Sequence, residues 1–195
     1  MTGVQLIAGL GNPGSEYVET RHNAGFRFLE ALCRQYGASL RTETRFSGRF
    51  GRCTISGNDV LLLAPTTYMN DSGVAVAKIA RYHKLSVDGI LIVHDDLDLP
   101  AGAVRLKVGG GNGGHNGLGS IEQALGSAAF MRLRLGIGRP PPGRGIIGYV
   151  LGRAPSSERE ALDLGIERAL MELPAVVDGR IQSAMNRLHT EPDRM

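Results

Sequence analysis

The sequence has few cysteines and no long apolar run. Of its 195 residues only Cys33 and Cys53 are cysteines, and none is tryptophan. Two cysteines cannot build a disulfide framework, which indicates a reducing compartment. No segment approaches 18 consecutive apolar residues, so a membrane-spanning helix is not expected. The chain also begins without a basic and apolar targeting pattern, and we therefore expect a cytoplasmic protein.

Two common catalytic and nucleotide-binding motifs are also missing. The sequence contains no G-x-S-x-G elbow, and neither cysteine has a motif partner nearby, which argues against a serine or thiol nucleophile. The glycine-rich stretch Gly109–Gly117 lacks the Gly-Lys-Ser/Thr ending of a phosphate-binding P-loop. Covalent catalysis by these residues and P-loop nucleotide hydrolysis are therefore not supported.

Short apolar runs alternate with segments of helical spacing through a chain that is 42% hydrophobic. The apolar runs predict strands at residues 4–10, 40–55 (one or two strands), 60–64, 90–93, 104–108 and 133–137. Helical spacing predicts helices at residues 26–36, from Asn70 or Ser72 to 82, from Asn116 or Ser120 to 125, and over most of 156–188. This alternation predicts one α/β domain over residues 1–195, with a twisted, mixed and mostly parallel sheet flanked by helices.

Two segments refine this prediction. The short strands within residues 40–64 are close enough in sequence to form an antiparallel hairpin. Residues 139–145 are rich in proline and glycine, and we expect residues 139–152 to form a mobile lid. Helices over residues 155–189 complete the domain.

Positive charge is concentrated in the middle of the chain. Residues 100–153 contain seven basic side chains and one acid, Glu122, although the net charge of the whole chain is only +3. The basic residues are Arg105, Lys107, Arg132, Arg134, Arg139, Arg144 and Arg153. A local basic patch of this kind recruits phosphate groups, although it is equally compatible with an ordinary solvated face.

Gly9–Gly14 follows the first predicted strand and matches the G-x-G-x-x-G pattern of dinucleotide-binding loops. Pro13 removes an amide that a pyrophosphate would need, and no strand ending in an acid follows about 20 residues later. The alternative is a tight turn at a strand end, which is still an active-site position in an α/β sheet.

His22 is the best general-base candidate among the five histidines, because it lies in a polar loop near a strand end. A histidine with an ordinary pKa near 6.5 suits proton abstraction at neutral pH. Taken alone, the same histidine is better explained as a helix cap. The strand at residues 90–93 is followed by Asp95, Asp96 and Asp98, and one of these carboxylates can orient a histidine and stabilise its protonated form.

The same acidic segment has a rival interpretation as a metal site. Asp96 and Asp98 alternate along an extended chain and can share a divalent cation with Asp95. No second carboxylate cluster or histidine pair in the sequence completes such a shell, so the prediction is a site without metal. Farther along, His115 and Asn116 end a glycine-rich loop at a helix N-terminus, where an anion or oxyanion can bind.

Taken together, these segments resemble the bacterial-type peptidyl-tRNA hydrolase family. Six blocks carry the resemblance, in the family's order and over nearly the whole chain. They are Gly9–Gly14 with Tyr17, Thr20–Phe26, Pro65–Gly73, His94–Pro100, Gly109–Ser120 and Arg132–Pro140. Each block is weak alone, whereas all six in order are highly specific.

The resemblance implies a monomeric enzyme that hydrolyses the ester between a peptide and tRNA, without metal or cofactor. His22 would be the catalytic residue and Asp95 its partner, with Asn12, Asn70 and Asn116 holding substrate and water. Tyr17 would contact the tRNA end, the 3'-terminal adenosine of the acceptor, while Met69 and His115 would line the cleft.

Arg105, Lys107 and Arg134 fall where the resemblance implies contacts to tRNA phosphates. One departure is visible at Gly119, where the family often has a basic residue, so no phosphate contact is assigned there. Two other functions remain open from the residues: a non-catalytic RNA-binding relative, and a nucleotide-dependent oxidoreductase built on Gly9–Gly14.

Overall fold

A computed structural model describes residues 3–190 of the chain. The strands are β1 (Leu6–Gly9), β2 (Arg41–Glu43), β3 (Gly48–Ile55), β4 (Asn58–Pro65), β5 (Ile90–Asp96), β6 (Val104–Val108) and β7 (Met131–Gly136). The α-helices are α1 (Ala24–Tyr36), α2 (Ser72–His83), α3 (Asn116–Leu125), α4 (Ile146–Val150), α5 (Ser156–Val177) and α6 (Ile181–His189). Short 3-10 helices are η1 (Ser15–Tyr17), η2 (Arg21–Asn23), η3 (Thr44–Phe46), η4 (Met69–Asp71) and η5 (Val87–Gly89).

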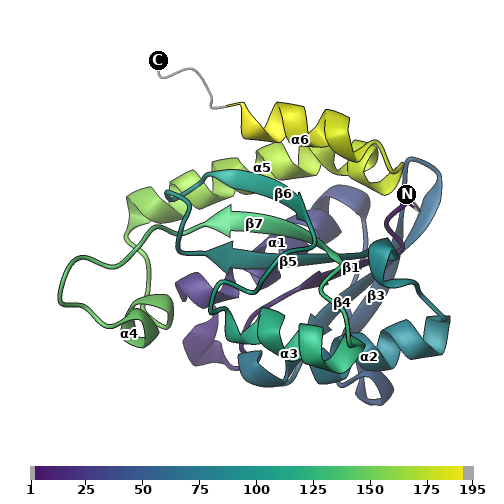
Figure 1. The fold of residues 1–195 in the computed structure, drawn as a ribbon, viewed down its shortest axis with the longest axis horizontal. Helices are drawn as coiled ribbons and strands as arrows, with labels where there is room; N and C mark the ends of the chain where they lie inside the picture. The colour runs from purple at the N-terminus through teal and green to yellow at the C-terminus, as the bar shows by residue number, and fades with distance from the viewer. Residues whose placement is uncertain (1–2, 191–195) are drawn as a thin grey trace.

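The seven strands form one twisted sheet in the order β2-β3-β4-β1-β5-β7-β6 (Figure 1). The four central strands β4, β1, β5 and β7 are parallel to one another, whereas β2, β3 and β6 join antiparallel at the two sides. This confirms the predicted mixed α/β sheet and the hairpin within residues 40–64. The parallel pairing is confined to the centre, with β2 and β3 antiparallel on one side and β6 antiparallel to β7 on the other.

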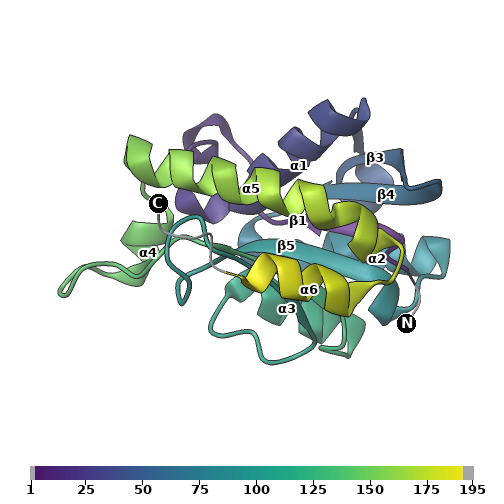
Figure 2. The ribbon, with the colours of Figure 1, turned by 90° about the horizontal axis from the view of Figure 1, so that it is seen from above.

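Helices cover both faces of the sheet, as Figures 1 and 2 show. On one face α1, α5 and α6 enclose a core that includes Phe28, Leu32 and Leu173. On the other face α2 and α3 enclose a second core that includes Phe46, Ile79 and Ile121. Two layers of helix on a largely parallel sheet bury the apolar strands on both sides, which explains their continuous hydrophobic runs.

The first helix is brought unusually close to the sheet. A Cβ placed on Gly25 would lie 2.3 Å from the amide nitrogen of Leu10 and 2.4 Å from the carbonyl oxygen of Val93. Only glycine allows this approach, so Gly25 sets the start of α1 directly on the ends of β1 and β5. The helix ends at Gly37, as predicted, because Gly37 adopts the left-handed conformation with φ 64°.

Two segments differ from the sequence prediction: the end of β5 and the segment that was predicted as a lid. β5 continues to Asp96 because it pairs with β7 up to Asp96 and Gly136. His94 and Asp95 therefore stand on the strand and point to opposite faces, rather than following it as a loop. Within the predicted lid, residues 146–150 form the short helix α4, and the loop before it extends away from the rest of the protein (Figure 1).

The predicted domain of residues 1–195 extends at both ends past the part that the structure describes. Among residues 3–190 no helix is both long and apolar enough to cross a membrane.

Candidate active site

The functional residues gather where the central parallel strands end. There a cleft of about 670 Å³, called here the His22 cleft, opens beside β5, the glycine-rich loop before α3, and α4. Its lining includes His22, His94, Asp95, His115, Asn116, Lys107, Arg134, Ile146 and Val150. Ligand sites of open α/β sheets form at the carboxyl ends of parallel strands, so this is the position that the topology predicts.

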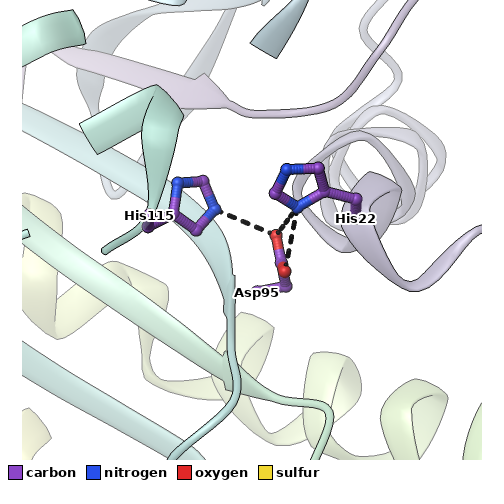
Figure 3. A group of neighbouring side chains, drawn as sticks. All are labelled: His22, Asp95 and His115. Atoms are coloured by element: carbon purple, nitrogen blue, oxygen red, sulfur yellow. Dashed lines mark hydrogen bonds and ion pairs between the residues drawn. The ribbon is translucent and has the colours of Figure 1, made fainter. Parts of the chain in front are cut away.

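His22 and Asp95 are hydrogen-bonded at the base of the cleft (Figure 3). Nδ1 of His22 lies 2.9 and 3.0 Å from the two carboxylate oxygens of Asp95. Because a carboxylate only accepts, Nδ1–H is the donor, and the other ring nitrogen, Nε2, carries the lone pair in the neutral ring. The His22 side chain is 11% exposed and that of Asp95 is 3% exposed. The pairing that the sequence predicted is therefore formed.

A second histidine donates to the same carboxylate. Nε2 of His115 lies 3.0 Å from Oδ1 of Asp95, and Nδ1 of His115 accepts from the backbone amide of Leu118 at 3.4 Å. The amide contact fixes the tautomer with the proton on Nε2. The sequence predicted that His115 lines the cleft and lies where an anion can bind, but not that it contacts Asp95. Its position directly before α3, as an N-cap residue, was the available signal for a more definite role.

His94 completes a group of three histidines around Asp95. Its Nδ1–H donates to the backbone carbonyl of Asp95 at 2.7 Å, and its ring meets that of His115 edge-on at 5.0 Å. Burial, together with the charge of His115, lowers the pKa of His94 to about 3. His94 is therefore neutral at physiological pH and adds no positive charge to the site.

The carboxyl of Asp95 is ionised throughout the ordinary pH range. Burial by itself would raise its pKa, but attraction from His115 and His22 and their two hydrogen bonds outweigh that effect and hold the pKa far below the usual value for aspartate. A buried carboxylate that accepts from two imidazoles is suited to stabilise positive charge on either ring.

Asn12 is fixed by a network that joins three segments. Its Oδ1 accepts from the backbone amide of Met69 at 2.7 Å, and its own backbone exchanges two hydrogen bonds with the side chain of Asn23. Among residues 3–190 the Nδ2 amide of Asn12 has no partner, so it is available to a substrate. Sequence reasoning missed Asn23, although it lies in the same polar block as His22.

Of the remaining predicted substrate residues, only Asn116 lines the His22 cleft, whereas Asn70, Tyr17 and Met69 lie outside its lining. Asn116 is the first residue of α3 and is exposed in the His22 cleft, whereas Asn70 is exposed on η4 outside its lining. Tyr17 lies on η1 with its ring 6.5 Å from that of Tyr68. Met69 is buried, and a Cβ on Gly117 would meet its sulfur at 2.6 Å, so glycine there lets α3 pack against η4.

The three predicted phosphate contacts differ in their surroundings. Lys107 is exposed and lines the His22 cleft. Arg134 also lines the cleft, but its Nε donates to Asp96 at 2.7 Å. Arg105 lies outside the cleft lining and donates to the carbonyl of Leu188 at the end of α6, at 3.3 Å. The sequence did not single out Arg139, which lines the cleft and pairs with Asp98 at 2.9 Å.

These ion pairs bear on the alternative metal site. Asp96 and Asp98 each accept from an arginine, and Asp95 faces two histidines, so the three carboxylates do not converge on one point. His22, Asp95 and His115 are the one group among the described residues whose ligand atoms lie close enough, within 4.8 Å, to hold an ion. Both ring nitrogens in that group are already directed at the carboxylate as hydrogen-bond donors.

Known proteins match both this sequence and this geometry. The peptidyl-tRNA hydrolase family matches residues 6–194. The peptidyl-tRNA hydrolase of Pseudomonas savastanoi pv. phaseolicola is 52% identical over 192 residues, which cover 98% of this chain and 99% of that protein. The one from Acinetobacter baumannii is 48% identical and covers 97% of each chain. A crystal structure of peptidyl-tRNA hydrolase from Acinetobacter baumannii has a TM-score of 0.94 at 47% identity, covering 97% of this chain and 96% of that one.

Proposed function

The chain belongs to the peptidyl-tRNA hydrolase family and is a hydrolase of that class, and we propose that it cleaves the ester between peptide and tRNA. In this proposal His22 is the general base that activates a water molecule. The observation that carries the proposal is the hydrogen bond from Nδ1 of His22 to the buried Asp95. It leaves Nε2 as the acceptor, on the side of the ring directed away from the carboxylate (Figure 3).

The proposed reaction needs no covalent intermediate. Nε2 of His22 takes a proton from water, and the oxygen of that water attacks the ester carbonyl. The tetrahedral intermediate collapses, the ribose oxygen leaves, and the proton on His22 passes to it. Free tRNA and free peptide are the products. General-base assistance of this kind contributes ~10²–10⁴ in rate.

Asp95 and His115 support the base in this mechanism. The carboxylate orients the His22 ring and balances the positive charge that develops on it. The hydrogen bond from His115 holds the carboxylate from its other side, so His115 acts through Asp95 as a positioning residue as well as lining the cleft. The neutral His94 fixes the backbone of the same aspartate.

The asparagine amides are assigned to the substrate. The side chain of Asn116 donates to the developing oxyanion, from a position at the start of α3 where the helix dipole also favours negative charge. Asn12 and Asn70 bind the peptide main chain, which has the same donors and acceptors in every sequence. Tyr17 and Met69 contact the end of the substrate.

We assign the basic side of the cleft to the acceptor end and 3'-terminal adenosine of tRNA. We also propose that the enzyme is a monomer and acts in the cytoplasm.

The decisive assay compares release of tRNA from N-acetyl-aminoacyl-tRNA with release from free aminoacyl-tRNA. We expect hydrolysis of the first and little of the second, because the acylated amine supplies the peptide bond that Asn12 and Asn70 bind. Equal rates on both would contradict this assignment.

Removal of one phosphate contact should weaken binding more than chemistry. Lys107→Ala should raise KM several-fold with little change in kcat, and should flatten the dependence of log KM on log salt concentration. Arg105→Ala should act in the same direction but less strongly, because its guanidinium is partly held by the carbonyl of Leu188. Steady-state kinetics at several salt concentrations measure this, and an unchanged salt slope in both variants would remove them from the RNA surface.

Chelation should leave the activity intact. Dialysis against EDTA is expected to change kcat/KM by less than about twofold, because water activation here depends on His22 rather than on a bound ion. The rate is compared before dialysis, after it, and after addition of Zn²⁺, Mn²⁺ or Mg²⁺. A loss that one of these ions restores would instead assign a metal to His22, Asp95 and His115.

A further inference from the structure

Arg21, the residue before His22, is buried and lies outside the lining of the His22 cleft. Its side chain is only 5% exposed and forms an ion pair with Glu158 of α5 at 2.9 Å. A buried arginine is costly unless its donors are satisfied, so the other partners of this guanidinium indicate what it holds in place.

Those other partners belong to the end of α4. Nη1 of Arg21 lies 3.2–3.4 Å from the backbone carbonyl oxygens of Tyr149, Gly152 and Arg153. The guanidinium also lies over the Tyr149 ring, 4.0 Å from its centroid. A cation at the carbonyl end of a helix is stabilised by those carbonyls, and stacking on an aromatic ring adds to it.

The backbone continues the same connection. The amide of Arg21 donates to the carbonyl of Gly152 at 3.2 Å, and Thr20 forms an isolated β-bridge with Arg153. The segment that carries His22 and the segment that ends α4 are therefore joined by backbone and side chain together.

The other side of α4 forms a wall of the His22 cleft. Ile146, Ile147 and Val150 line the cleft, and Ile146 and Ile147 are 51% and 75% exposed. Apart from the contacts of Arg21, α4 is held mainly by a small core of Ile137, Tyr149 and Val150, with Tyr149 donating its hydroxyl to the carbonyl of Ile137 at 2.8 Å. A helix of five residues with so small a core depends strongly on each contact.

We propose that Arg21 is a positioning residue that locks α4 to the His22 turn, so that the apolar wall of the cleft and the catalytic base keep a fixed separation. The proposal rests on the proposed function only because it assumes that this apolar wall of the cleft contacts the substrate. Arg21 acts through α4 and does not itself touch the reacting atoms.

The test compares Arg21→Lys with Arg27→Gln. Lysine keeps the positive charge beside Glu158 but lacks the planar fork that spans three carbonyls and stacks on Tyr149. Arg27 forms a bidentate ion pair with Asp163 of α5 at 2.6 Å and, among residues 3–190, no hydrogen bond or ion pair with α4, so Arg27→Gln removes an ion pair to the same helix α5 without touching the lock. Tyr149→Leu removes the lock from the other side, while Tyr149→Phe keeps the stacked ring.

The first measurement is limited proteolysis without substrate. Trypsin cleavage after the exposed Arg144, in the loop before α4, should become ~10-fold faster or more in Arg21→Lys and Tyr149→Leu, and stay near the native rate in Arg27→Gln. Because no activity is needed, this result stands or falls independently of the proposed hydrolysis. Equal acceleration in Arg27→Gln, or no acceleration in the first two variants, would overturn the lock.

The second measurement separates KM from kcat. A displaced wall should raise KM ~10-fold in Arg21→Lys and Tyr149→Leu, with a smaller fall in kcat, whereas Tyr149→Phe should remain within about threefold of native. A fall in kcat with native KM and native proteolysis would mean that Arg21 merely supports the His22 turn, and would contradict the role assigned to α4.

Discussion

Replacing His22 with alanine should reduce kcat by ~10²–10⁴-fold while tRNA binding stays near its native level. In the proposed mechanism the imidazole is the base that takes the proton of water, and it is not among the basic side chains assigned to phosphate. Single-turnover hydrolysis of N-acetyl-aminoacyl-tRNA measures the chemical step, and filter binding of uncharged tRNA measures the Kd.

The control for this variant is another histidine outside the site. His83 lies at the end of α2 against Phe46 and Phe50, remote from Asp95. His83→Gln should retain at least about half of the native kcat. Near-native turnover in His22→Ala would exclude the general-base mechanism, whatever the control shows.

Asp95→Asn should have an effect of similar size, a fall in kcat of ~10²–10⁴-fold with little change in KM. An asparagine of the same shape carries no charge to balance a protonated His22. Its amide NH₂ would also face a ring nitrogen that is itself a donor, and this favours the wrong tautomer of His22 or His115. Kinetics and the histidine NMR signals of the variant report the two consequences separately.

The pH dependence of kcat/KM tests the role of Asp95 a second time. Since the pKa of Asp95 lies far below its usual value, the carboxylate stays ionised as pH falls, and it titrates only in strong acid. The acid limb of native kcat/KM should therefore reflect protonation of an imidazole and not of Asp95. Asp59→Asn, at the exposed start of β4, is the matched control and should leave both kcat and the acid limb unchanged. A carboxyl-like acid limb would contradict this assignment.

The sheet was predictable because its signals are local. Apolar runs, the glycine that ends α1, and polar residues at strand ends each occupy a few consecutive positions. The central strands followed from such runs, and β2 and β3 from the alternation within residues 40–55. The length of β5 did not, because its pairing with β7 extends into the polar residues His94–Asp96. The pairing of His22 with Asp95, which are 73 residues apart, was instead an expectation from the family resemblance.

The contacts that organise the site were not predictable in the same way. His115 and Asp95 are 20 residues apart, and Arg21 and Tyr149 are 128 apart. Each pair meets only after several strands and helices have packed, so no spacing rule in the sequence reports it. The same limit applies to the interpretation of Asp96 and Asp98 as a joint cation site. Their arginine partners, Arg134 and Arg139, come from another part of the chain, so no local pattern reports these ion pairs.

The two edges of the sheet have a consequence for how copies of the protein meet. One edge is β2, which is only three residues long, and the other is β6, which carries Arg105 and Lys107. A short edge strand and a charged one are both poor templates for adding a strand from another chain, so the sheet resists edge-to-edge aggregation. The cations of β6 thus repel the same edge of a second copy, in addition to the contact with RNA phosphate that we propose for them.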